Sequence, residues 1–95
     1  MSVAMEGEQV VISLIGEIDI ANAALLPDRV STIVDGDKPV RLDLTQVTFL
    51  DASALRGILM CEAGLGRKGV DLKLRNVPDH AKRIFEVTQL THLIE

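Results

Sequence analysis

The feature that most constrains the fold of this chain is the alternation of short strand-like segments with longer stretches of helical spacing. Apolar residues that alternate with polar ones, or that are rich in β-branched residues, predict β-strands over 9–15, 40–44 and 70–74. Apolar residues at helical intervals predict helices over 20–34, 52–65 and 78–87. Strands that alternate with helices favour a mostly parallel or mixed sheet with helices packed on it. We therefore expect a small α/β fold.

Glycine and proline residues predict where these elements end. Gly16 ends the first strand, and Gly66 or Gly69 ends the second helix. Pro27 lies inside the first helical stretch, where a proline costs about 3 kcal/mol, so the regular helix either begins near Pro27 or is kinked there. The apolar tail over 90–94 predicts a last strand or a turn.

The composition indicates one domain with an aliphatic core. Hydrophobic residues make up 47% of the 95 residues, but the only aromatic ones are Phe49 and Phe85. No repeat or linker divides the chain, so we expect a single domain over residues 1–95. The shortage of aromatic rings and the net charge of -4 argue against a nucleic-acid partner. Cys61 is the only cysteine, which excludes an intramolecular disulfide, and it falls on the apolar arc of its helix, where we expect it to be buried.

Membrane insertion and catalysis find no support in the sequence. No apolar run reaches the ~18 residues that span a bilayer, and residues 1–8 lack the pattern of a secretory signal, so we expect a cytoplasmic protein. His80 and His92 lack metal-binding spacing, and no nucleophile elbow or Walker A loop is present. The glycines over 64–69 imitate a dinucleotide-binding motif, but they follow a helix and precede a strand. We expect no catalytic residue, no metal site and no cofactor.

The second predicted helix carries the most informative pattern. Asp51 directly precedes it and is suited as its N-cap. Intervals of about 100° place one arc toward the sheet, formed by Ala54, Leu55, Ile58, Leu59, Cys61 and Leu65. Glu62 falls inside that arc and does not fit it. The opposite arc holds Ser53, Arg56, Gly57, Met60 and Gly64. These residues predict a shallow surface that another protein could approach, although surface glycines and one exposed Met are also tolerated without any function.

Ser53 lies in the first turn of this helix. The amides of the first turn and the helix dipole favour an added negative charge there, while Asp51 opposes it. A phosphate on Ser53 would change the docking face by roughly two charges without rearranging the domain. Ser53 is therefore a candidate phosphorylation site.

Three stretches, in order and with intact spacing, carry a resemblance. Residues 16–19 read G-E-I-D, residues 42–55 read L-D-L-T-Q-V-T-F-L-D-A-S-A-L, and residues 72–93 form the closing strand and helix. Together they resemble the STAS domain family, named for sulfate transporters and anti-sigma factor antagonists, whose signatures are G-E-[LI]-D and D-S-S-G-L. The resemblance covers nearly the whole chain.

The resemblance implies a bacterial anti-sigma factor antagonist. Its unphosphorylated form would bind an anti-sigma factor, a serine kinase of the histidine-kinase-like ATPase fold, and so free a sigma factor for transcription. The kinase would inactivate it by phosphorylating a residue beside the motif aspartate, and a phosphatase would restore it. The family's docking surface maps onto Asp19, Asp51, Ala52, Ser53 and Arg56. With the small-residue arc described above, the expected partner-binding residues are Asp19, Asp51, Ala52, Ser53, Arg56, Gly57 and Met60.

The sequence departs from the family pattern at the acceptor. The usual acceptor directly follows the aspartate, where this chain has Ala52, and the family glycine is replaced by Ala54. Either Ser53 is an alternative acceptor, presented about 100° further around the helix, or the domain is a permanently unphosphorylated binder or scaffold. STAS domains also occur in anion transporters, in stress-sensing complexes and as the small soluble subunit of a phospholipid-trafficking transporter, so a transporter partner in trans is the alternative.

Overall fold

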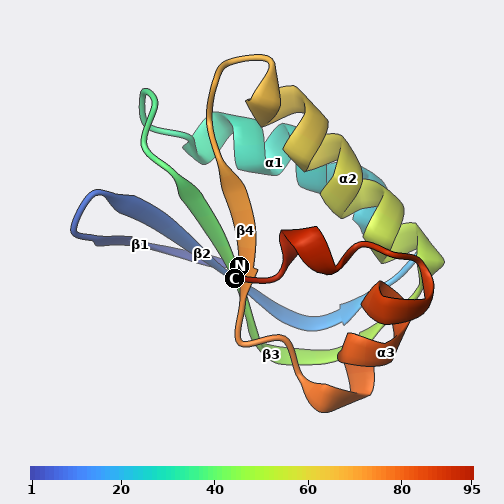
Figure 1. Cartoon of the computed structure of the whole chain (residues 1–95). Helices are drawn as coiled ribbons and strands as arrows, with labels where there is room; N and C mark the ends of the chain where they lie inside the picture. The colour runs from blue at the N-terminus through green and yellow to red at the C-terminus, as the bar shows by residue number, and fades with distance from the viewer.

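The computed structural model describes all residues, 1–95, as a sheet with helices on one face (Figure 1). The sheet runs in the order β1 (Ser2–Glu6), β2 (Gln9–Ile18), β3 (Val40–Leu50) and β4 (Leu72–Arg75). The helices are α1 (Leu26–Ile33), α2 (Ala52–Gly66) and α3 (Asp79–Val87), with short 3-10 helices η1 (Ala23–Leu25) and η2 (Thr91–Leu93). β2, β3 and β4 are parallel, and β1 is antiparallel to β2. The expected α/β fold is confirmed, and its sheet is mixed.

The sequence pattern predicts no strand over 2–6, yet β1 forms a hairpin with β2 there. All five residues of β1 are exposed. Because neither face of this strand is buried, its sequence does not alternate between apolar and polar residues. The connecting turn is two residues long, and its first residue, Gly7, has φ +61, which glycine adopts without strain. The hairpin is therefore specified by its turn and by pairing with β2.

The first helical stretch divides before Pro27. The 3-10 helix η1 comes first, and α1 then begins at Leu26 with Pro27 in its first turn, where no amide is needed for a helical hydrogen bond. Of the two alternatives that the sequence left open, a helix that starts near Pro27 is confirmed.

Two strands run further than predicted. β2 continues through Gly16, at φ +83, to Ile18. Its register with β3 shifts between Ser13 and Ile15 and again between Gly16 and Glu17. β3 continues to Leu50, beyond the predicted end at 44. The predicted ends are wrong because such irregularities interrupt the alternation from which a strand is recognised. The longer strands place Ile18 next to Leu50.

One aliphatic core lies between the sheet and the helices. Its side chains come from β2, β3, β4 and all three helices, and Phe85 is its only aromatic residue. α2 turns its expected arc to this core, with Leu59 only partly buried. Glu62, which did not fit the arc, is half-buried at its rim. Its Oε2 lies 3.3 Å from Nε2 of His92 in the C-terminal tail.

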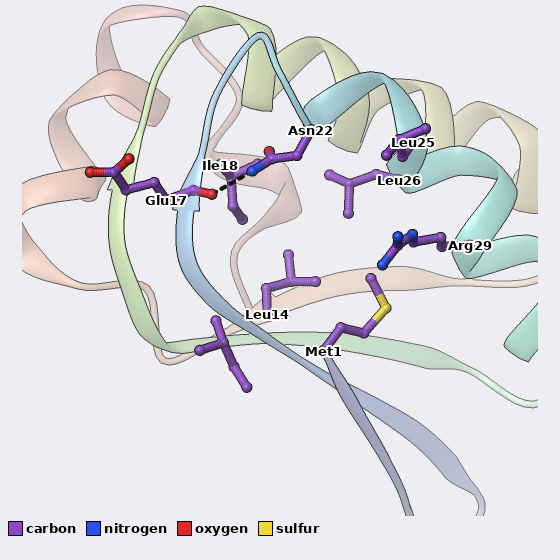
Figure 2. A pocket seen from close by; sticks show the side chains of 9 residues that line it. Met1, Leu14, Glu17, Ile18, Asn22, Leu25, Leu26 and Arg29 are labelled. Atoms are coloured by element: carbon purple, nitrogen blue, oxygen red, sulfur yellow. Dashed lines mark hydrogen bonds between the residues drawn. The ribbon is translucent and has the colours of Figure 1, made fainter.

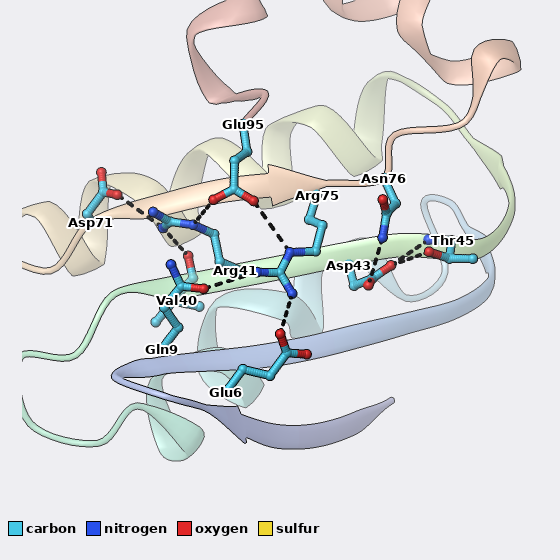
Figure 3. A network of polar contacts seen from close by, with 10 residues as sticks. All are labelled: Glu6, Gln9, Val40, Arg41, Asp43, Thr45, Asp71, Arg75, Asn76 and Glu95. Carbon is cyan, nitrogen blue, oxygen red and sulfur yellow. Dashed lines mark hydrogen bonds and ion pairs between the residues drawn. The ribbon is translucent and has the colours of Figure 1, made fainter.

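The opposite face of the sheet carries a network of charged side chains (Figure 3). Nε of Arg41 lies 2.7 Å from Oε2 of Glu95, and Nη1 of Arg41 lies 3.1 Å from Oδ2 of Asp71. Nη1 of Arg75 lies 2.9 Å from Oε1 of Glu6, and Nε of Arg75 lies 3.4 Å from Oε1 of Glu95. The network therefore links the hairpin, two strands and the C-terminal residue.

The C-terminal tail forms no regular strand. It forms η2 and then a single parallel bridge between Leu74 and Ile94, where the amide of Glu95 donates a hydrogen bond to the carbonyl of Leu74 (2.8 Å). None of the helices combines the length and the apolar content that crossing a membrane requires.

Candidate functional site

Most of the expected site residues meet where the parallel strands β2 and β3 end. Ile18 and Leu50, the last residues of these strands, are paired neighbours. The turn that follows β2 and the start of α2 therefore lie beside each other. The carboxyl ends of parallel strands are the usual place for binding sites in α/β folds, because the segments that follow the strands gather there. The structure brings together Asp19, Asp51, Ala52 and Ser53 at this edge.

The turn after β2 is held by its own side chains. Oδ1 of Asp19 accepts a hydrogen bond from the amide of Ala21 (2.9 Å). The Asn22 side chain closes the turn, since its Oδ1 accepts from the amide of Asp19 (3.0 Å) and its Nδ2 donates to the carbonyl of Glu17 (2.7 Å; Figure 2). The carboxylate of Asp19 therefore shapes the turn, and Ile20, which is 81% exposed, follows it on the surface.

A cavity of about 150 Å³ lies between the end of β2 and the segment formed by η1 and α1 (Figure 2). Its lining is mostly apolar, with Arg29 as its cation and Glu17 as its acid. None of the expected partner-binding residues lines it, so this cavity is separate from the surface at the start of α2.

The start of α2 has the predicted cap. Asp51 is extended, at φ -121 and ψ -169, and its Oδ1 accepts a hydrogen bond from the amide of Ala54 (3.1 Å). The next residue, Ala52, is exposed, and Ser53 is half-buried. No hydrogen bond within the protein engages the Ser53 hydroxyl. The side chains of Ala52 and Ser53 in the first turn therefore play no part in the cap.

The rest of α2 exposes only a narrow strip. One flank packs against η1 and α1, and the other meets the tail through Glu62 and His92. We call the exposed residues between these flanks the α2 strip, which consists of Ala52, Arg56, Met60, Ala63 and Gly66. Arg56 is exposed, and Met60 is 53% exposed, so both lie on the outer surface where sequence analysis placed them.

The expectation that Gly57 belongs to the outer surface is wrong. Gly57 is buried, and a Cβ on it would lie 2.6 Å from the carbonyl oxygen of Ala23. The absence of a side chain therefore allows η1 to rest directly on α2. The helical wheel missed this contact because it assigns only two faces, whereas α2 has neighbours on three sides.

Two exposed apolar residues near the site were not singled out by sequence analysis. Phe49 is 47% exposed and pairs in register with Glu17, next to the buried pair of Ile18 and Leu50. The period of the strand was the available signal, because a residue next to a core-facing one points to the opposite face. Ile20 had no such signal, since it also fits the beginning of a helical pattern.

The arrangement presents surface rather than reactive groups. No cluster of three or more His, Cys, Asp and Glu side chains has the proximity that a metal ion needs. Burial raises the pKa of the Cys61 thiol to about 11, so the nucleophilic thiolate is scarce at neutral pH. Nε2 of His80 lies 3.3 Å from the carbonyl oxygen of Val47. The site therefore consists of exposed apolar and charged side chains.

Comparisons with known proteins agree on the fold. The family model described as "Mlab, STAS domain" matches residues 1–95. The anti-sigma-B factor antagonist of Bacillus subtilis (strain 168) is 25% identical over 84 residues, which are 88% of this chain and 77% of that protein. The crystal structure of an anti-sigma factor antagonist from Mycobacterium paratuberculosis has a TM-score of 0.80 at 23% identity, covering 98% of this chain and 80% of that one. The STAS domain of a SulP transporter from Vibrio cholerae has a TM-score of 0.73 at 15% identity, covering 97% of this chain and 72% of that one.

Proposed function

This chain belongs to the STAS domain family, and from that premise we propose that it is an anti-sigma factor antagonist-like regulator that binds a partner protein. The partner is an anti-sigma factor serine kinase of the histidine-kinase-like ATPase fold. Capture of that kinase in the bacterial cytoplasm frees a sigma factor and so controls transcription. Similarity to the antagonist of Bacillus subtilis supports this role.

The observation that carries the proposal is the exposed surface at the start of α2 and along its outer side. Arg56 and Met60 are exposed on the α2 strip, and Ile20 is exposed in the turn beside the start of α2. Arg, Met and large apolar side chains are enriched in protein interfaces, where their burial supplies binding energy. Asp51 and Ser53 add polar groups to this surface.

Ser53 is the candidate switch within this surface. Its hydroxyl has no partner in the protein, and it lies in the first turn of α2, where free amides favour a phosphate. Asp51 sits two residues before it and opposes the added charge. Phosphorylation would thus leave α2 in place and add roughly two negative charges to the docking face.

A second function is supported by Ala52. This exposed residue stands where the family has its acceptor, and it carries no hydroxyl. A constitutive STAS scaffold, or a subunit that joins a transporter or stress-signalling complex in trans, needs no acceptor. The shared fold with a transporter STAS domain agrees with this role.

Binding to purified candidate kinases tests the proposed surface. We expect Met60→Glu to weaken binding at least tenfold, because a charge replaces the central apolar contact of the surface. The matched control is Val87→Glu, the same kind of change at a residue of α3 that is 65% exposed. It should bind like the unmodified protein. Equal binding by the Met60→Glu variant would refute the surface, provided that circular dichroism shows both variants folded.

Intact mass after incubation with kinase and ATP separates the two functions. If the chain is a switchable antagonist, we expect one added phosphate on the unmodified protein and none on the Ser53→Ala variant. A chain that binds a kinase but takes up no phosphate is the constitutive binder. A phosphate that persists on Ser53→Ala would show that the acceptor is another residue. A permease or transport ATPase encoded beside the gene would favour the transporter role, and a kinase-like anti-sigma gene would favour the antagonist.

A further inference from the structure

A groove runs beside the α2 strip along the second half of α2. It lies between α1 and the second half of α2 and has a volume of about 320 Å³, roughly twice that of the cavity beside β2. Its floor is apolar, formed by Val30, Cys61 and Leu65, and Met60 stands at its rim. The groove is therefore continuous with the exposed strip around Met60.

The charges around this groove are unusual for an acidic chain. Arg67 and Lys68 line the groove, and Arg56 lies one turn before Met60. No ion pair within the protein engages these three cations, whereas Arg41 and Arg75 each contact two carboxylates. The groove has one acid in its lining, Asp28 on α1. Its net charge is positive, although that of the whole chain is -4.

The dipole of α2 accounts for part of this pattern only. Cations after the last turn of a helix stabilise it, which suits Arg67 and Lys68. It does not explain Arg56 in the first half of α2. The dipole also does not explain the position of the Arg67 guanidinium group, which lies over Gly64. Its Nη2 would be only 3.8 Å from a Cβ on Gly64. The guanidinium thus lies beside the groove with its charge unpaired.

We propose that this groove binds an acidic amphipathic helix of the partner protein. An apolar side chain of that helix enters the groove beside Met60, and carboxylates on its flanks meet Arg56, Arg67 and Lys68. A groove with an apolar floor between two helices suits a third helix, and the small residue Gly64 allows a close approach of its backbone. The inference rests on the proposed function, because it names the chemistry of the partner at the same surface.

The spacing of the cations sets the size of the partner helix. Arg56 and Arg67 are eleven residues apart on α2, which corresponds to about 16 Å along the helix axis at 1.5 Å per residue. A partner helix that lies along the groove therefore needs acidic residues about three turns apart, with an apolar residue between them.

A designed probe tests the groove in the full chain. The probe is a stapled helical peptide of 16 residues with Glu at both ends and Leu in the middle, and its counterpart has Gln in place of Glu. We expect the Glu probe to shift the amide NMR signals of Met60, Gly64, Arg67 and Lys68. The Gln probe should bind at least fivefold more weakly, because the carboxylate contacts are lost. Signals that move elsewhere, or equal binding by both probes, would overturn the inference.

Charge reversal gives the matched comparison. Arg67→Glu with Lys68→Glu should weaken the Glu probe about tenfold, whereas Lys82→Glu with Arg83→Glu makes the same charge change on α3 and should leave it unaffected. Arg67→Gln, a milder change, should fall in between. Two other occupants contradict the proposal. One is a second copy, seen as signal shifts that follow protein concentration, and the other is a membrane, seen as binding to phosphatidylglycerol vesicles that the same reversal abolishes.

The failures of the two proposals can be told apart. If Met60→Glu abolishes kinase binding but the Glu probe leaves the groove signals unmoved, the proposed function stands and the groove inference falls. If the Glu probe binds in the groove but no candidate kinase binds the unmodified protein, the groove stands and the proposed partner is wrong.

Discussion

Gly57 shows how one residue sets the relation between the two halves of the site. The carbonyl of Ala23 in η1 rests where the side chain of Gly57 would be. The same η1 segment follows the turn that begins at Asp19, so this contact holds the turn against the start of α2. A residue without a side chain therefore sets how this turn lies against α2.

Gly57→Ala should lower the free energy of unfolding by about 1–3 kcal/mol. The added Cβ would overlap the carbonyl oxygen of Ala23, and a backbone atom cannot move aside by changing a side-chain rotamer. Kinase binding should weaken as well, since the Asp19 turn must move. The control is Gly66→Ala, which has open space around it and should gain up to about 1 kcal/mol from its helix propensity. Urea unfolding followed by circular dichroism measures both. Equal stability of Gly57→Ala and the unmodified protein would contradict the contact.

Among the elements, α2 was the most predictable and β1 the least. The N-cap at Asp51 and the apolar arc of α2 are local patterns, so the sequence displays them directly. β1 buries none of its five residues, so its sequence shows no apolar pattern. Its pairing with β2 depends on the turn that joins the two strands. The extents of β2 and β3 were underestimated because an irregular register re-phases the side chains. The exposed places of Arg56 and Met60 on α2 were therefore predictable, whereas the contact of η1 with Gly57 was not.

The carboxylate of Glu95 joins the C-terminal tail to the sheet through Arg41 and Arg75. A hydrogen bond from Arg41 outweighs partial burial, and one from Arg75 adds to it, so the pKa of Glu95 lies below its ordinary value of 4.5. A carboxyl with a lowered pKa in the folded state stabilises the fold above its unfolded pKa, and this contribution is lost as the pH falls through the folded pKa.

Glu95→Gln should therefore lower the melting temperature at pH 7 more than at pH 3. The difference between the variant and the unmodified protein should shrink as the pH falls below about 4.5, where the carboxyl of the unmodified protein becomes protonated. Thermal unfolding at several pH values checks this. A difference that is constant with pH would mean that Glu95 acts through packing alone.

At the scale of the whole molecule, one core joins every helix to the sheet. Phe85 of α3 lies in the same cluster as the buried residues of α1, α2 and the three parallel strands. A small domain with one core is expected to unfold in a single cooperative transition. The two phenylalanines differ sharply, because Phe85 is fully buried while Phe49 is 47% exposed.

Phe85→Ala should lower the free energy of unfolding by about 3–5 kcal/mol, the usual cost of removing a buried aromatic ring. Phe49→Ala, the same change on the surface, should cost less than about 1 kcal/mol. Circular dichroism and methyl NMR signals should give one transition midpoint for each variant. Loss of α3 alone in Phe85→Ala, with the sheet intact, would show that the core is divided.

The sequence by itself determined the α/β class, the aliphatic core, the cap and inner arc of α2, and the buried place of Cys61. These features depend on residue type and on apolar residues that repeat every two positions in strands or every 3.6 in helices. Short stretches of the chain contain such patterns. Only the tertiary structure decided that Gly57 is covered by η1, that Glu62 meets His92, and that the unpaired cations Arg67 and Lys68 line one groove. Such contacts join residues far apart in the chain, and the burial of a residue depends on which distant segment lies over it.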